Sequence, residues 1–407
     1  MKDSTIKQIP PLRFPEFKGD WVRKKLGEVA EKINSGKTPL GGESVYSASG
    51  ILFIRSQNVN DDKLSFDNST FISEKINNTM KNSVVKSNDI LLNITGASLG
   101  RSCVVPENFT IGNVNQHVCI IRLNKESNPR FVQPILSSTK GQNTFISLQT
   151  GSGREGLNFE SIKGIEISLP ILPEQTKIAT FLTAIDEKIQ AIKKKKSLLE
   201  AYKKGIMQKL FSQELRFKDD VGKEYNDWKE KKLREVGTFF SGGTPLTTNR
   251  TYFDGTIPFI RSGEINAEKT AQFISEEGLK NSSSKLIESG DLIYALYGAT
   301  SGEVAISKIS GAINQAILCI RTNMVNPFLY NYLVYEKENI INTYLQGGQG
   351  NLSADIIKSL NIPIPCHEEQ TKIANFLSSI DEKINNCQAQ ITNVEVWKKG
   401  LLQKMFV

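Results

Sequence analysis

The chain has 407 residues, a formal net charge of +8, 39% hydrophobic residues and a sequence pI of about 9.0. This composition is typical of a folded globular protein and excludes a disordered chain, and the length predicts two to three domains. No apolar run reaches the roughly 18 residues of a membrane span, and the first residues lack the apolar core of a signal peptide. We therefore expect a cytoplasmic protein.

The five cysteines are widely spaced and form no CxxC pair, and only two histidines accompany them. This spacing predicts neither a disulfide framework nor a metal site. The modest positive charge permits a polyanionic partner without requiring one.

The chain contains an internal repeat. Residues 174–211 and 369–406 align without a gap at an offset of 195, with 20 identities in 38 positions. The preceding segments repeat more loosely, for example Trp21 with Trp228 and the Phe-Ile-Arg-Ser of 53–56 with that of 259–262. The offset there is larger, so insertions have accumulated only in the parts outside the gap-free segments. A repeat of this kind predicts two similar units, each followed by a spacer of fixed length.

The two gap-free segments predict long helices. Apolar residues recur every seven positions from Ile178 and from Ile373, which is typical of a coiled-coil seam. An alternative is that each helix packs separately on its own domain, but the absence of gaps favours mutual pairing. We predict that the pairing residues are Ile178, Leu182, Ile185, Ile189, Ile192, Leu199, Ile206, Ile373, Leu377, Ile380, Ile384, Cys387, Val394 and Leu401, of which Cys387 is the unusual one.

The first helical segment also carries much of the positive charge. Residues 174–211 hold nine lysines and four acidic residues, including four consecutive lysines at 193–196. Such a run is usually a solvated helix face. Contact with DNA phosphates or with a partner subunit remains the alternative.

The regions before each helix predict mixed α/β domains. Apolar runs at 51–54, 90–94, 118–123 and 165–169 are typical of strands, and clusters of Gly, Ser, Thr and Asn separate them. Each such loop, taken alone, is an ordinary turn or a binding loop. Because the same loops recur in both copies, and because short polar side chains with Arg, Asn and Gln suit phosphates and base edges, DNA binding is a specific hypothesis.

Catalytic motifs are not recognisable. The segment Ser35-Gly36-Lys37-Thr38 lacks the first glycine of a phosphate-binding loop, since Glu31 stands there. No nucleophile elbow, methyltransferase turn or glycine-rich cofactor loop is found, so we expect a binding protein without its own chemistry or cofactor. Two alternatives are an enzyme with a hidden nuclease or methyltransferase site and a helical scaffold that binds only protein.

The motif Pro-Glu-Gln-Thr-Lys-Ile-Ala at 173–179, the end Lys-Lys-Gly-x-x-Gln-Lys at 203–209 and their second copies at 368–374 and 398–404 carry a specific likeness. The chain resembles the specificity subunit of type I restriction-modification systems. The resemblance implies an α+β fold with two mixed α/β target-recognition domains at 15–172 and 213–366, after an N-terminal segment at 1–14. It implies helical spacers at 173–212 and 367–407 that pair as an antiparallel coiled coil.

The resemblance further implies that each domain reads one half of a split, asymmetric double-stranded DNA site. The helices would set the spacing and dock two modification subunits, which methylate adenine with S-adenosylmethionine. Restriction subunits that use ATP and Mg would complete an assembly with one copy of this non-catalytic chain. We predict DNA contacts by polar loop residues of both copies: Lys37, Arg55, Ser56, Asn58, Ser98, Arg101, Asn115, Gln116, Arg154, Thr244, Arg261, Ser262, Tyr297, Thr300, Asn314, Gln315, Gln349 and Asn351.

Overall fold

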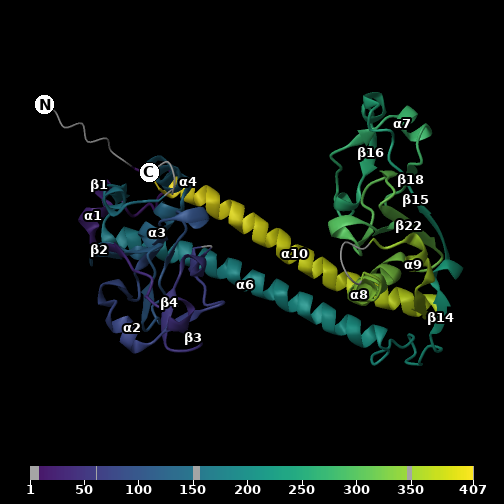
Figure 1. The fold of residues 1–407 in the computed structure, drawn as a ribbon, viewed down its shortest axis with the longest axis horizontal. Coiled ribbons are helices and arrows are strands. Elements are labelled where there is room, and N and C mark those ends of the chain that lie inside the picture. The colour runs from purple at the N-terminus through teal and green to yellow at the C-terminus, as the bar shows by residue number, and fades with distance from the viewer. Residues whose placement is uncertain (1–8, 61, 150–155, 346–350, 407) are drawn as a thin grey trace. The chain divides into compact units, whose positions relative to one another are not determined.

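The computed structural model describes residues 9–60, 62–149, 156–345 and 351–406. Its contacts divide the chain into two compact units. Unit 1 is Met1–Ile192 with Gln390–Val407, and unit 2 is Lys193–Ala389. Each unit therefore holds one globular domain and one part of each of two long helices (Figure 1).

Unit 1 is built around an antiparallel four-stranded sheet in the order β10-β9-β12-β2, with bounds Ser102–Val104, Ile90–Asn93, Val118–Leu123 and Ala30–Ser35. All four residues of β9 are buried, because both faces of this sheet are covered. Leu91 and Ile120 face a core shared with a second sheet, whereas Ile90 and Ile121 belong to a core shared with helices. The second sheet has the order β3-β7-β4-β11-β8, with bounds Tyr46–Ser47, Thr70–Ile72, Ile51–Ile54, Gly112–Val114 and Val84–Val85.

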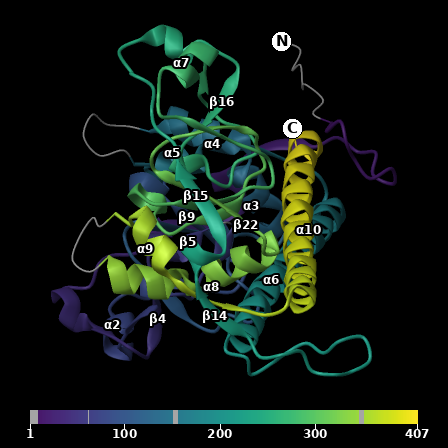
Figure 2. The same cartoon turned by 90° about the vertical axis from the view of Figure 1, so that its right-hand side faces the viewer.

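Unit 2 repeats this arrangement (Figure 2). Its central antiparallel sheet is β15-β22-β19-β20, with bounds Gly237–Ser241, Ile317–Thr322, Leu292–Ala295 and Val304–Ile306. The second sheet is β17-β16-β21-β18, with bounds Phe273–Ile274, Ile257–Ile260, Gly311–Ile313 and Lys285–Ile287. In both units one strand pair of the second sheet is parallel, β4 with β11 and β16 with β21. The strands predicted at 51–54, 90–94, 118–123 and 165–169 are confirmed.

A two-stranded ribbon leads into each long helix. In unit 1 it is β1 with β13, bounds Val22–Lys25 and Glu166–Leu169, and in unit 2 it is β14 with β23, bounds Lys229–Lys232 and Asn361–Ile364. Unit 1 adds the small pair β5 and β6, Val59–Asn60 and Lys63–Leu64. The shorter α-helices are α1 Leu26–Val29, α2 Glu74–Asn78, α3 Pro129–Ser137, α4 Thr139–Leu148, α5 Phe159–Lys163, α7 Glu276–Lys280, α8 Asn326–Tyr344 and α9 Ala354–Ser359.

The long helices α6, Leu172–Phe211, and α10, His367–Met405, pair in each unit. In unit 1 the first half of α6 shares a core with the last turns of α10, and Lys398 Nζ lies 2.6 Å from Asp186 Oδ1. In unit 2 the first half of α10 shares a core with the last turns of α6, and Lys203 Nζ lies 2.7 Å from Asp381 Oδ1. Since the beginning of each helix meets the end of the other, the pair is antiparallel, as predicted.

The fourteen predicted seam residues lie along α6 and α10, and eleven of them belong to or pack against the two cores in which the helices meet. Most are buried, and the rest are half-buried. The buried ones are Ile178, Leu182, Ile185, Ile189, Ile373, Leu377, Ile380, Cys387 and Leu401, and the half-buried ones are Ile192, Leu199, Ile206, Ile384 and Val394. The alternative of two separately packed helices is therefore wrong.

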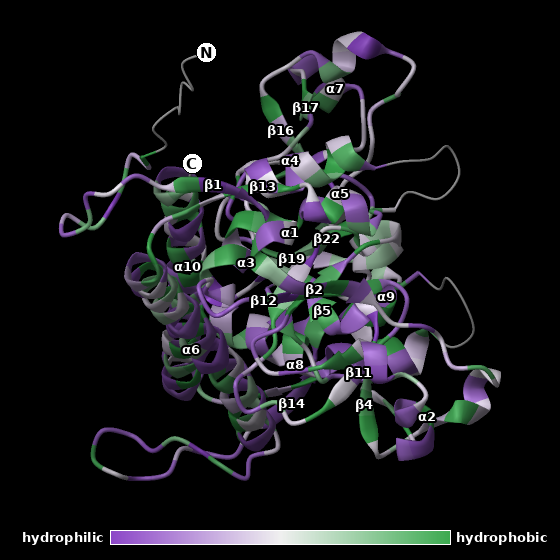
Figure 3. Ribbon diagram, turned by 90° about the vertical axis from the view of Figure 1, so that its left-hand side faces the viewer, coloured by the Kyte–Doolittle hydropathy of each residue, from purple (hydrophilic) through white to green (hydrophobic). Residues whose placement is uncertain are grey.

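Hydrophobic residues concentrate in the strands, whereas the two long helices are mostly hydrophilic (Figure 3). Of the four consecutive lysines, those at 193–195 are exposed and Lys196 pairs with Glu200 at 3.3 Å. Among the described residues, no helix has the length and apolar character needed to cross a bilayer.

Candidate nucleic-acid interface

Loops of unit 1 converge at one end of its central sheet. Because neighbouring strands are antiparallel, the end of β2, the start of β12 and the end of β9 meet there. Backbone bonds join the loops, from Gly36 N to Asn115 O at 3.1 Å and from Ile94 N to His117 O at 3.0 Å. Leu157 N then donates to Ile94 O at 2.9 Å. We call residues 36–38, 94–98 and 115–117 loop cluster 1.

The polar side chains of loop cluster 1 form a chain of contacts. Thr38 Oγ1 donates to Gln116 Oε1, and Gln116 Nε2 lies 3.0 Å from His117 Nε2. His117 Nδ1 lies 2.5 Å from Thr95 Oγ1. Thr38, Gln116 and the neighbouring Lys37 are exposed. Short donors and acceptors held in this way at a protein surface are suited to phosphate oxygens and base edges.

Unit 2 forms the equivalent loop cluster 2, residues 242–244, 296–300 and 314–316. Leu296 N donates to Ala316 O at 2.8 Å, and Leu352 N donates to Leu296 O at 3.0 Å. Thr244 Oγ1 donates to Gln315 Oε1 at 2.7 Å, as Thr38 does to Gln116. Ala316 takes the place of His117, so loop cluster 2 has the same backbone frame and different side chains.

A glycine is required at the same point in both clusters. A Cβ atom at Gly36 would lie 1.6 Å from Val114 O, and one at Gly242 would lie 1.7 Å from Ile313 O. Any side chain there would push the loop away from the strand beside it. The residue that follows is free to differ, and it is Lys37 in one cluster and Gly243 in the other.

The predicted arginines that follow the strands β4 and β16 have different partners. Arg55 Nη2 donates to Thr70 Oγ1 at 2.6 Å, whereas Arg261 Nε lies 3.2 Å from Glu264 Oε2 and the Arg261 side chain is exposed. Burial raises the pKa of Glu264, but hydrogen bonds from Ala271 N and from Arg261 outweigh it, and the net pKa is lowered. Arg261 thus contacts a carboxylate, whereas Arg55 contacts a hydroxyl group.

Two asparagines of unit 1 that were predicted to contact DNA are buried, and their side chains make hydrogen bonds within the unit. Asn58, 2% exposed, accepts from Arg55 N at 3.0 Å and donates to Ser65 O at 3.2 Å. Asn115, 7% exposed, accepts from His117 N at 3.1 Å. Their side chains stabilise the loops, and the exposed residues beside them are the better candidates for DNA contact.

The other predicted DNA-contact residues have varied settings. Arg101, Asn351 and Gln315 are exposed. Arg101 Nη1 donates to Asn60 Oδ1, and Asn314 accepts from Ala316 N at 3.1 Å. Ser56, Ser98, Ser262, Tyr297 and Thr300 are half-buried, while Arg154 and Gln349 lie outside the described residues. Contact of any of these residues with DNA stays a prediction.

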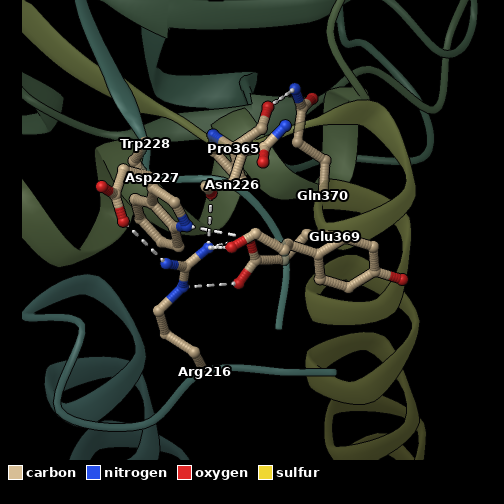
Figure 4. A network of polar contacts seen from close by, with 8 residues as sticks. Arg216, Asn226, Asp227, Trp228, Pro365, Glu369 and Gln370 are labelled. Atoms are coloured by element: carbon tan, nitrogen blue, oxygen red, sulfur yellow. Dashed lines mark hydrogen bonds and ion pairs between the residues drawn. The ribbon is translucent and has the colours of Figure 1, made fainter. Parts of the chain in front are cut away.

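Sequence reasoning missed a buried polar network at the start of each long helix. Arg13 donates from Nε and Nη2 to Glu174 at 2.6 and 2.7 Å, and Trp21 Nε1 lies 3.2 Å from the same carboxylate. In unit 2, Arg216 and Trp228 contact Glu369 in the same manner (Figure 4). We call these the Glu174 clamp and the Glu369 clamp. The repeated Glu-Gln of the helix motif and the repeated Trp were the available signals.

A second repeated ion pair was also missed. Arg122 contacts Asp89 at 2.7 Å from two nitrogens, and Arg321 contacts Asp291 at 2.9 and 2.6 Å. Each pair joins adjacent strand ends of a central sheet. The bonds to Asp291 raise the pKa of Arg321.

In the described part of the chain, no three His, Cys, Asp or Glu side chains are grouped as they would be to hold a metal ion. The five cysteines are free, and burial raises the pKa of Cys119 to about 12.

A family model described as the type I restriction modification DNA specificity domain matches this chain twice, at residues 18–201 and 225–395. The chain belongs to this family. Each match contains one loop cluster, together with part of the long helix that follows it. The type I specificity family thus accounts for both copies of the internal repeat.

One relative in the type I specificity family matches the chain over nearly its full length, and another matches less than half of it. The specificity subunit of the type I restriction enzyme MjaVIII from Methanocaldococcus jannaschii is 24% identical over 422 residues, which covers 98% of this chain and 95% of the relative. The EcoR124I/EcoR124II specificity subunit from Escherichia coli is 26% identical over 171 residues, 39% and 42% of the two chains.

Two solved structures share the fold. The type I restriction-modification S subunit from M. genitalium superposes with a TM-score of 0.64 at 17% identity, and 98% of this chain and 99% of that chain are covered. A chain from a study of complex assembly and conformational transition of the type I R-M system gives a TM-score of 0.58 at 18% identity, with 96% and 98% covered. The predicted α+β fold of two tandem domains with a helix pair is confirmed.

Proposed function

We propose that this chain is the non-catalytic, DNA-reading specificity subunit of a type I restriction-modification complex. Unit 1 reads one half of a split, asymmetric site through loop cluster 1, and unit 2 reads the other half through loop cluster 2. The observation that carries the proposal is the recurrence of one loop frame whose residues differ at two positions, Lys37 against Gly243 and His117 against Ala316. Two copies of one frame provide two reading surfaces, and different side chains provide two different half-sites.

The helix pair has a separate role in this proposal. The pair sets the distance between the half-sites and docks two modification subunits, and restriction subunits join the assembly. One copy of this chain serves each complex in the cytoplasm. The chain itself needs no cofactor, while S-adenosylmethionine, ATP and Mg serve the partner subunits.

Methylation mapping tests the proposal. The chain is co-produced with its modification subunit, and adenine methylation is mapped across a host genome by long-read sequencing. We expect one split motif with two unlike halves, and exchange of residues 15–172 for the corresponding domain of a relative should change one half only. A stable complex that methylates no split motif contradicts the proposal.

The purified chain alone separates the two alternatives. A hidden enzyme would cut or methylate DNA without partner subunits, and a protein-only scaffold would not bind DNA. We expect the purified chain neither to cut nor to methylate DNA. We expect it to bind DNA with an affinity that falls as the salt concentration rises, because phosphate contacts release counterions.

Lengthening the helix pair tests the spacing role. Seven residues inserted in α6 and in α10 keep the seven-residue seam and add about 10 Å, or about three base pairs. We expect the methylated motif to gain about that many spacer positions while both half-site sequences stay the same. Changed half-sites with a constant spacer would contradict this role.

A further inference from the structure

Each long helix begins at a buried carboxylate. Glu174 and Glu369 are both 0% exposed and lie in the first turn of α6 and of α10. A negative charge in the first turn is favoured by the helix dipole, but complete burial requires specific partners. The clamps provide these partners in both units.

Each clamp connects the segment that precedes a domain to the long helix that follows the domain. Arg13 and Trp21 precede β1, which pairs with β13, and β13 leads within a few residues into α6. Arg216 and Trp228 precede β14, which pairs with β23 in the same way before α10. A single carboxylate thus holds the segment that enters the domain against the helix that leaves it.

The glutamine after each clamp residue holds a third segment. Gln175 Nε2 donates to Pro170 O at 2.9 Å, and Gln175 Oε1 accepts from Asn128 N at 2.9 Å. In unit 2, Gln370 contacts Pro365 O and Val325 N, both at 3.0 Å. The backbone at 128 and at 325 starts the helices α3 and α8. Three segments of each domain are therefore fixed to the first turn of its long helix.

The loop cluster and this attachment lie at opposite ends of one strand. Strand β12 runs from Val118, beside loop cluster 1, to Leu123, close before Asn128. Six strand residues span about 20 Å. A rotation of about 10° at the attachment would displace the loops by about 3.5 Å, close to the rise of about 3.4 Å per base pair. Strand β22, Ile317–Thr322, has the same relation to Val325 in unit 2.

We propose that Glu174 and Glu369 are positioning residues, which fix the angle of each reading domain on its long helix and thereby restrict the chain to one spacer length between half-sites. This inference rests on the proposed function. Within the part of the chain that the structure describes, no hydrogen bond or ion pair joins a clamp to a loop cluster. The clamps therefore act on where each domain reads and not on which bases it reads.

The test maps methylation by the complex with variant chains. Glu174→Gln and Glu369→Gln keep the side-chain shape and remove the charge that holds the arginine. For each we expect both half-site sequences to persist, while methylation of sites with one base pair more or less in the spacer rises at least about tenfold. Glu187→Gln, at an exposed position on α6, is the matched control. With this variant, methylation should stay restricted to sites of one spacer length.

Trp21→Phe and Trp228→Phe are a second pair of variants, which remove the indole N–H donor while an aromatic ring stays at each position. They keep the proposal testable if a glutamine variant does not fold, and we expect a smaller relaxation of the spacer from them. If folded complexes of these variants still methylate sites of one spacer length only, the inference is overturned. Loss of one half-site sequence with a constant spacer also overturns it. A wild-type complex without any split motif overturns the proposed function instead.

Discussion

The two units share a set of polar contacts and differ in the side chains of their loop clusters. Both units have a clamp on a buried glutamate, backbone contacts from the glutamine that follows it, an Arg–Asp pair and a Thr–Gln contact between loops. Loop cluster 1 carries Lys37 and His117, where loop cluster 2 carries Gly243 and Ala316. Buried polar contacts tolerate little change because an unpaired buried group is costly, whereas these two loop positions differ between the units.

The units also differ where unit 1 has α3 and α4 and unit 2 has the single helix α8. The break in unit 1 falls at Ser138, whose hydroxyl caps α4 by accepting from Gly141 N at 3.1 Å. Pro134 lies inside α3, four residues before the break. The difference shows that a unit can change its peripheral helices while it keeps the attachment to the long helix.

The largest expected effect is loss of a clamp arginine. Arg13→Ala and Arg216→Ala each leave a buried carboxylate without its positively charged partner, and we expect each to lower the free energy of unfolding by about 3–5 kcal/mol. Urea denaturation of the full chain measures this. Arg23→Ala removes an exposed ion pair with Glu166 and should change stability by less than about 0.5 kcal/mol. Equal effects of Arg13→Ala and Arg23→Ala would show that the clamp is not a special site.

Loop substitutions should act on one half-site at a time. Gln116→Ala is expected to weaken DNA binding by about 1–3 kcal/mol through the half-site read by unit 1, and Gln315→Ala through the other. Competition binding with DNA altered in either half measures the loss. After Gln116→Ala, changes in the first half-site should matter less and changes in the second should matter as before. Equal sensitivity to both halves would contradict separate reading.

The two ion pairs between α6 and α10 should each contribute little to the stability of the chain, and by similar amounts. Lys203→Met and Lys398→Met remove contacts of 2.7 and 2.6 Å between partly exposed side chains. We expect each to lower the free energy of unfolding by at most about 1 kcal/mol, with a smaller loss at high salt. Denaturation at low and high salt checks this, and a large effect of only one lysine would show that the two halves of the helix pair are unlike.

The smallest expected effect concerns pH. Burial raises the pKa of Asp291, but Arg321 and the N–H of Glu288 outweigh it, and the pKa in the folded chain lies below its ordinary value. The ionised form therefore stabilises the fold above about pH 4, and this stabilisation is lost as pH falls through the lowered pKa. Asp291→Asn should reduce the decrease in the free energy of unfolding at acidic pH. The difference should be less than about 1 kcal/mol, because Arg321 is partly exposed. An unchanged acid profile would contradict this.

Much of the architecture could be predicted from sequence because its signals are local. The seven-residue period from Ile178, the gap-free repeat and the apolar strand runs each reflect contacts that recur along one element. The loops of the two clusters were predicted as candidate DNA-binding loops because they recur in both copies. Their convergence could not be derived, because it depends on which strands are neighbours in the sheet.

The candidate site divides in the same way. The choice of Lys37, Gln116 and Gln315 rested on residue type and repetition, and the structure places them on exposed loops. Asn58 and Asn115 have the same residue chemistry, but their side chains are used inside the unit. Residue type alone cannot distinguish these cases, since burial is decided by the surrounding fold.

The sequence by itself determined the twofold repeat, the two long helices, their seam and the family resemblance. Only the tertiary structure showed that Arg13 and Glu174, 161 positions apart, share a buried carboxylate contact, and that Arg216 and Glu369 repeat it. Helix and strand periods are set by neighbours along the chain. A buried charge pair instead depends on the path of the whole domain, which brings its first and last segments to the same helix turn.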